Sequence, residues 1–164
     1  MSNAISSALQ RNPTYEGWCD DSHREGFREE LARQIRSEAQ RYVAPVSEPD
    51  LCGAIRRISE AVSQRWGKYL TNGRLKYGTA KKAFNLYLKF LWRLGKATTP
   101  PHCPIDRTVL QASGINDAWT QRDSERQHLE WINRISLRAK ALSLAEWEYG
   151  LWLQNATRSK PCRR

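Results

Sequence analysis

Apolar residues recur at spacings of three and four along most of the chain, and runs that alternate with a period of two are almost absent. The clearest stripe is Phe27, Leu31, Ile35 and Ala39, between residues 21 and 43. This spacing places its members on one face of an α-helix, whereas a strand requires alternation. We therefore expect an all-α protein whose helices form a compact single-domain bundle.

The boundaries of several helices can be predicted from capping residues and helix breakers. Thr79 is a candidate N-cap for a strongly apolar helix that Gly95 ends. Ser143 and Glu146 have the spacing of a capping box. The expected helices cover residues 21–43, a segment after Asp50 that ends near Trp66, 80–94, 106–112, 120–141 and a segment that begins at Ser143.

The length of 164 residues fits one domain. Hydrophobic residues make up 40% of the chain and include seven tryptophans, which is enough for a substantial core. We expect an N-terminal extension at residues 1–20, a helical domain at 21–157 and a basic tail at 158–164.

The chain is strongly basic, with 27 Lys and Arg against 17 Asp and Glu, a net charge of +10. Such an excess attracts polyanions, because binding releases their condensed counterions. DNA, RNA and anionic membrane surfaces all qualify as partners. The alternative is a basic surface that serves only solubility.

Several other classes of protein have little support. No stretch approaches the roughly 18 to 20 apolar residues that a membrane span needs, and residues 1–10 lack the pattern of a signal peptide, so we expect a cytoplasmic protein. Cys19, Cys52, Cys103 and Cys162 are scattered and contain no C-x-x-C pair, which favours free thiols. Cys19 and His23 alone do not make a zinc site, so neither a metal nor another cofactor is expected.

The segment at residues 78–110 carries the chemically informative residues. Lys81 and Lys82 fall in the first turn of an apolar helix, where the helix dipole opposes their charge. Desolvation there lowers the pKa of a lysine, and its amine becomes nucleophilic near neutral pH. Asp106 follows a turn with three prolines in residues 100–104 and begins a short helix. It is equally well explained as a helix cap and as a catalytic carboxylate.

The order of a lysine on a helix, a loop and then Pro104-Ile105-Asp106-Arg107-Thr108-Val109 resembles the helix-hairpin-helix DNA glycosylases, including the 8-oxoguanine group. The resemblance implies that a lysine attacks the anomeric carbon of the sugar. It also implies that Asp106 assists deprotonation and stabilises the oxocarbenium-like transition state. Alignment of the Lys-Lys-Ala motif puts Lys81 in the catalytic place, whereas matching the whole helix favours Lys82, which we prefer narrowly. The family's Leu-Pro-Gly-Val-Gly hairpin has at most a divergent counterpart between Gly73 and Gly78.

A glycosylase must hold an extruded base in a pocket and must grip the DNA backbone. The candidate base-binding residues are His102, Asn85 and Trp119. The candidate DNA-binding residues are Arg74, Lys76, Lys89 and Arg107. The backbone amides at the start of the Thr79 helix can also hold a phosphate.

These features together predict a monomeric DNA glycosylase, a hydrolase that excises a damaged or modified base. The role is either DNA repair or antiviral defence against phages with modified DNA, and a lysine Schiff base would add AP-lyase activity.

One alternative is a non-enzymatic helical module that binds nucleic acid. Another is a helical interaction protein with an acidic partner. A nucleophile pair of Cys103 and His102 is disfavoured, because adjacent residues rarely point at each other.

Overall fold

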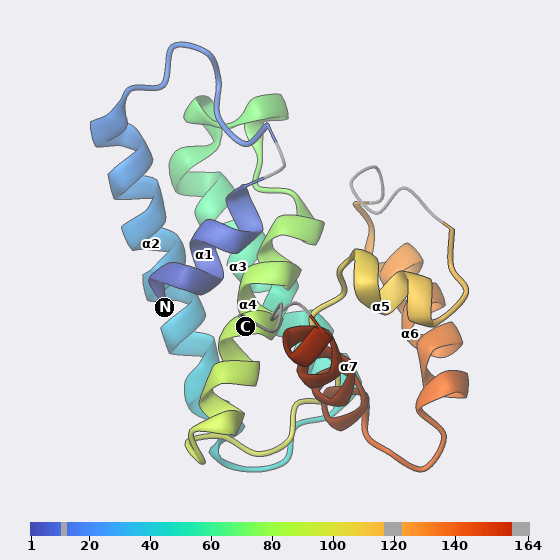
Figure 1. Cartoon of the computed structure of the whole chain (residues 1–164). Helices are drawn as coiled ribbons and strands as arrows, with labels where there is room; N and C mark the ends of the chain where they lie inside the picture. The colour runs from blue at the N-terminus through green and yellow to red at the C-terminus, as the bar shows by residue number, and fades with distance from the viewer. Residues whose placement is uncertain (11–12, 117–122, 159–164) are drawn as a thin grey trace, which may run out of the picture.

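The computed structural model describes residues 1–10, 13–116 and 123–158, and it confirms the all-α class. Extended pairing within this part of the chain is limited to one bridge between Tyr15 and Leu70. None of the helices described is both long and apolar enough to cross a bilayer. Figure 1 shows the helices, which are α1 (Ser2–Leu9), α2 (Asp21–Ala39), α3 (Glu48–Trp66), α4 (Tyr77–Arg93), α5 (Arg107–Ala112), α6 (Glu125–Ala139) and α7 (Leu144–Arg158). Short 3-10 helices cover Gln40–Val43, Gly67–Tyr69 and Thr71–Gly73.

The first hydrophobic cluster is built by α1 to α4. It contains the predicted stripe of α2, including Phe27 and Leu31, together with Ile55 of α3 and Phe84 of α4, all of which are completely buried. These helices pack around α4, as its apolar residues on nearly all sides predict. On α3, Ile55, Ile58 and Val62 are all completely buried.

Helix α1 is an integral part of this core. Ala4, Ile5 and Ala8 are buried, and α1 packs mainly on α4. The predicted extension at residues 1–20 thus contributes a helix to the bundle. The sequence signal was weak because α1 is only eight residues long and its buried side chains are small apart from Ile5.

A second hydrophobic cluster joins the loop before α5 to α5, α6 and α7. Its buried members include Cys103, Leu110, Trp131 and Ile135. Figure 1 shows these three helices on the other side of α4 from α2. Helix α4 therefore separates the two clusters, and one of its faces meets the C-terminal helices.

The predicted end of α4 and the predicted start of α7 are confirmed. The helix expected after Asp50 begins earlier, at Glu48 with Ser47 as its N-cap, and the helix expected at 120–141 covers only Glu125–Ala139, because Ser124 caps it. The Ser143–Glu146 capping box is formed, since Glu146 N donates to Ser143 Oγ and Ser143 N donates to Glu146 Oε2. Gly95 follows α4 in the left-handed region with a φ of 67°, and Lys96 N donates to Leu91 O across it.

The predicted N-cap at Thr79 is wrong. Helix α4 begins at Tyr77 with Lys76 as its N-cap, so Thr79 lies inside the first turn and is 2% exposed. Threonine commonly caps helices, but here Thr79 lies inside a buried first turn. A first-turn amide, Gly78 N, instead donates to the side chain of Asp123.

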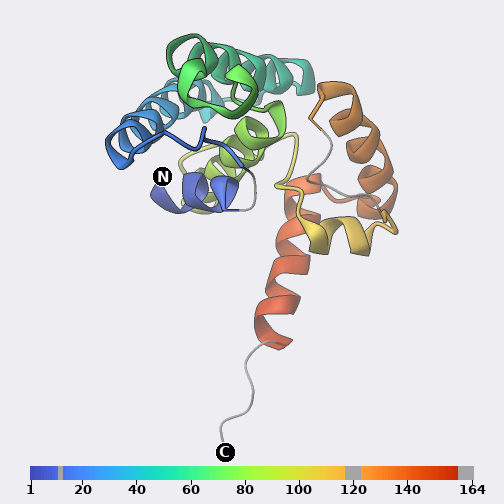
Figure 2. The ribbon, with the colours of Figure 1, turned by 90° about the horizontal axis from the view of Figure 1, so that it is seen from above.

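Helix α7 extends beyond the rest of the ribbon in Figure 2. Its last two turns are largely exposed, with Trp152 and Leu153 among the exposed large hydrophobic residues. The helix runs to Arg158, where the predicted basic tail begins, and residues 159–164 lie outside the described part of the chain.

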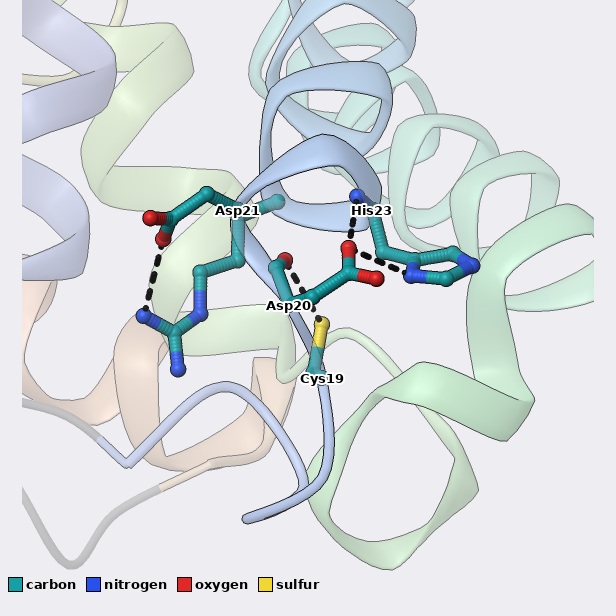
Figure 3. A network of polar contacts seen from close by, with 5 residues as sticks. Cys19, Asp20, Asp21 and His23 are labelled. Carbon is teal, nitrogen blue, oxygen red and sulfur yellow. Dashed lines mark hydrogen bonds and ion pairs between the residues drawn. The ribbon is translucent and has the colours of Figure 1, made fainter.

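Asp20 and His23 make a local polar contact at the start of α2. Asp20 is the N-cap, and its Oδ1 accepts from His23 N and lies 2.6 Å from His23 Nδ1 (Figure 3). Cys19 precedes the helix and is a buried free thiol, as are Cys52 and Cys103. Among the residues that the structure describes, no group of three or more His, Cys, Asp or Glu is placed to hold a metal ion.

Candidate functional site

One face of α4 carries three polar residues that are buried. Lys81, Asn85 and Lys89 follow each other at spacings of four and are 7%, 1% and 8% exposed. Residues at this spacing lie along a single helix face. Their partners lie in the loop before α5 and in α6 and α7. We call this interface the polar seam, and its members are Lys81, Asn85, Lys89, His102, His128 and Glu148.

Lys81 is one of the buried charged residues of the seam. Its Nζ lies 5.3 Å from the ring centroid of Trp131 on α6. Burial lowers the pKa of Lys81 to about 8, although the nearby Cys103 and Asp123 act in the opposite direction. At pH 7 about one Lys81 amine in ten is therefore neutral and carries a free electron pair.

Lys81 is therefore better suited to nucleophilic chemistry than Lys82, the lysine preferred narrowly from the sequence. Lys82 lies beside it on α4 and is only half-buried. Burial favours the neutral form of an amine, and Lys81 is the more buried of the two lysines.

Two histidines and a glutamate form a chain of polar contacts next to Lys81. His102 Nε2 lies 2.9 Å from Glu48 Oε2, and His102 Nδ1 lies 3.0 Å from His128 Nε2. Both histidines are 1% exposed, and burial is the main reason why their pKa values are lowered. The predicted base-binding residue His102 is thus anchored at both ring nitrogens, and it bonds within the protein.

Asn85 and Cys103 occupy the middle of the seam. Asn85 Nδ2 donates to Cys103 O at 3.3 Å, and Asn85 Oδ1 is buried with no hydrogen-bond partner. Burial raises the pKa of the Cys103 thiol, so this cysteine stays protonated at neutral pH. A thiolate nucleophile at Cys103 is therefore disfavoured by its surroundings.

Lys89 and Glu148 close the other end of the seam. Lys89 Nζ donates to Glu148 Oε1 at 2.8 Å, and both side chains are below 10% exposed. The Lys89 ammonium also lies 5.3 Å from the ring centroid of Trp152. The predicted DNA contact Lys89 is therefore buried and paired with a carboxylate of the chain itself.

Asp106 is the N-cap of α5. Its Oδ1 accepts from Val109 N at 3.0 Å, and the residue is exposed. Burial is the main cause of the raised pKa of Cys103, and the charge of Asp106 adds to it. Cys103 in turn acts on the pKa of Lys81, in the direction opposite to burial. Cys103 is therefore a common neighbour of the predicted carboxylate and the buried amine.

The first turn of α4 is held by Asp123, which comes just before α6. Gly78 N donates to Asp123 Oδ1 at 3.0 Å, and Arg74 Nη2 donates to Asp123 Oδ2 at 2.6 Å. The backbone amide expected to hold a phosphate thus holds a carboxylate of the chain itself. Arg107 is exposed beside Asp106, Lys76 is half-buried, and Trp119 lies outside the described residues.

Four residues of this site were not predicted from the sequence. They are Glu48, Asp123, His128 and Glu148. His128 carried a usable signal, because it falls on the apolar stripe of α6 with Trp131, Ile132 and Ile135. Glu48 and Asp123 gave none, because they reach the site only through tertiary packing.

A second basic region surrounds a hollow between α1, α2 and the end of α3. It is lined by five arginines, among them Arg24, Arg33 and Arg65, and by four acidic residues. Arg33 and Arg65 both pair with Glu30, and Arg24 pairs with Asp21. Because its charges are largely matched, this region is a weaker candidate for binding a polyanion.

The chain matches no protein-family model, and neither the curated proteins nor the solved structures compared with it gave a match. A function can therefore be inferred only from the residues of the chain, and chiefly from the chemistry of the polar seam.

Proposed function

We propose that this protein is a DNA glycosylase that excises a damaged or modified base, with Lys81 as the attacking amine. The observation that carries the proposal is the buried Lys81, whose pKa is lowered to about 8. A buried lysine is costly unless function requires it, and a lowered pKa is typical of lysines that form Schiff bases. The resemblance at residues 78–110 supports the same chemistry.

The reaction needs an electron pair and a stabilising negative charge. The neutral Nζ of Lys81 attacks the anomeric carbon of the nucleotide, and the N-glycosidic bond breaks with its electrons passing to the base. The attacking nitrogen then loses a proton, and opening of the sugar ring gives a Schiff base. Asp106 is the carboxylate for the positive charge that develops on the sugar, and it is exposed at the start of α5.

Access of DNA requires a basic rim around the seam. Arg107 is exposed next to Asp106, and Arg74 and Lys76 precede α4. Asp123 bonds to both Arg74 and Gly78 N, so an arriving phosphate competes with this carboxylate. The net charge of +10 favours the approach of DNA as a whole.

The deciding experiment measures base release. Wild type and Asp106→Asn are incubated with duplexes that carry oxidised, deaminated and hypermodified bases, including modified phage DNA. Abasic sites are detected by alkaline cleavage, and borohydride traps the Schiff base. We expect release by wild type alone. We also expect Lys81→Ala to abolish trapping and Lys82→Ala to retain it.

A non-enzymatic nucleic-acid-binding module is the second candidate. Its support is the N-capping contact of Asp106, which explains this residue without catalysis. Tight binding of DNA with no base release from the whole panel would favour the module. Trapping that depends on Lys82 and persists in Lys81→Ala would contradict the assignment of the nucleophile.

A further inference from the structure

A line of three polar side chains in contact joins three parts of the fold. Its members are Glu48, His102 and His128. Glu48 is the first residue of α3, His102 lies in the proline-rich loop, and His128 is on α6. The two contacts of 2.9 Å and 3.0 Å use both ring nitrogens of His102. The line begins at the surface, where the Glu48 side chain is 47% exposed, and ends inside the protein.

The hydrogen positions in this line follow from the acceptor at its outer end. An ionised glutamate only accepts hydrogen bonds, and the start of a helix favours its negative charge. His102 must therefore donate from Nε2 to Glu48. Because burial keeps His102 neutral, its Nδ1 is bare and accepts from His128 Nε2.

The inner end of the line is a bare nitrogen. Burial also keeps His128 neutral, so with a proton on Nε2 its Nδ1 has a free electron pair. This Nδ1 is buried and has no hydrogen-bond partner. A buried acceptor without a partner is unfavourable in a structural role, which indicates that it serves another group.

Lys81 is a charged group that acts electrostatically on His128. Its Nζ lies over Trp131, one turn along α6 from His128, and the Tyr77 ring, one turn before Lys81 on α4, lies 6.4 Å from the His128 ring. The positive charge of Lys81 disfavours protonation of both histidines. The charged or titratable groups that act on His128 and Lys81 at the inner end also include His102, Cys52, Cys103 and Asp123.

We propose that Glu48, His102 and His128 form a proton relay that connects the buried amine of Lys81 with solvent. This inference rests on the proposed function of Lys81 as the nucleophile. A nucleophilic amine must lose protons during the reaction, and burial keeps bulk water away from it. The relay supplies the missing route.

Each transfer in the relay breaks one N–H bond and forms the next. Lys81 Nζ gives its proton to His128 Nδ1, directly or through one water molecule, and keeps the electron pair. His128 passes its Nε2 proton to His102 Nδ1, and His102 passes its Nε2 proton to the Glu48 carboxylate. The result is a neutral Lys81 amine and a protonated Glu48, whose proton exchanges with water. The same transfers in reverse return a proton to Lys81 and restore the original hydrogen positions.

The first test determines the resting hydrogen positions by nitrogen-15 NMR of the histidine rings in the full chain at pH 7. The chain has three histidines, and His23 is an internal control. His102 and His128 are expected to be neutral with the proton on Nε2. His23 bonds to Asp20 through Nδ1 and is expected to carry a proton there. A proton on Nδ1 of His128 overturns the relay.

The second test measures transfer through the relay without any DNA. The exchange of the Lys81 ammonium protons with water is followed by nitrogen-15 NMR. Glu48→Gln keeps an acceptor for His102 but cannot take up a proton, so we expect exchange to slow by about tenfold or more. Glu60→Gln, which removes an exposed carboxylate from the same helix, is the matched control and is expected to leave the rate unchanged.

The outcomes separate the relay from the proposed function. Unchanged exchange in Glu48→Gln overturns the relay, whatever the enzyme does with DNA. Slowed exchange with no borohydride trapping in wild type supports the relay and contradicts the glycosylase. Slowed exchange together with trapping that depends on Lys81 supports both.

Discussion

Lys81 combines a lowered pKa with burial, and this combination affects the stability of the folded protein. Its pKa is about 8 in the folded state against 10.5 for a lysine in water. Between these two values the folded state binds fewer protons than the unfolded state, so stability rises with pH. Below pH 8 the unfavourable contribution is complete and amounts to about 3 kcal/mol.

Lys81→Met is therefore expected to stabilise the protein at pH 7 by up to about 3 kcal/mol, because methionine keeps most of the apolar volume and removes the charge. The rise in stability between pH 8 and 10.5 should disappear. Urea denaturation at several pH values measures both effects. Lys82→Met is the matched control, and we expect it to keep this pH dependence. Destabilisation by Lys81→Met at pH 7 would contradict the assigned cost of burial.

Asp106 has a structural role and a proposed catalytic role, and two substitutions separate them. Asp106→Asn keeps an oxygen that accepts from Val109 N, so the free energy of unfolding should change little. Asp106→Ala removes the cap and should cost about 1 kcal/mol. Under the proposed function both variants lose base excision. Excision that survives in Asp106→Asn would leave Asp106 with the capping role alone.

At the scale of elements, α4 shows what the sequence predicts and what it does not. Its strongly apolar composition and Gly95 correctly predicted a central helix with a defined end. Its start was misplaced, because Asp123, far along the chain, bonds to the first turn. The lysine pair was located on the right helix, but only packing against Trp131 shows that Lys81 is the buried member.

The same limit applies to the rest of the polar seam. Asn85 and His102 were identified as candidate residues, and the structure brings both into the seam with Lys81. Lys89 was predicted as a DNA contact, and the partner that the structure gives it, Glu148, is 59 residues away in the sequence. Pairings over such distances depend on the tertiary fold and leave no local pattern.

The pair of Lys89 and Glu148 couples α4 to α7, and we expect its loss to be asymmetric. Glu148→Ala leaves the Lys89 charge buried alone and should destabilise the protein by about 3–5 kcal/mol. Replacing both residues by methionine should cost much less, because no unpaired charge remains. Urea denaturation of both variants measures the difference. Equal destabilisation in the two variants would indicate that packing, and not charge, dominates at this site.

At the scale of the whole molecule, the basic residues behind the net charge of +10 differ in how far acidic side chains neutralise them. The arginines that line the hollow at α2 are largely matched by acidic neighbours. Helix α5, which begins at the exposed Arg107, lies on the other side of α4 from α2 (Figure 1). A polyanion is therefore expected to bind near the polar seam and not at α2.

The salt dependence of DNA binding tests this location. Each phosphate that a lysine or arginine neutralises contributes about −0.9 to the slope of log affinity against log salt concentration. Arg107→Gln and Lys76→Gln should each reduce the slope by about one and weaken binding to all sequences alike. Fluorescence anisotropy with a labelled duplex over a salt series measures the slope. Arg36→Gln on α2 removes the same charge and is expected to leave the slope unchanged. A smaller slope for Arg36→Gln than for wild type, with no change for Arg107→Gln, would place the DNA on the α2 face and separate it from Lys81.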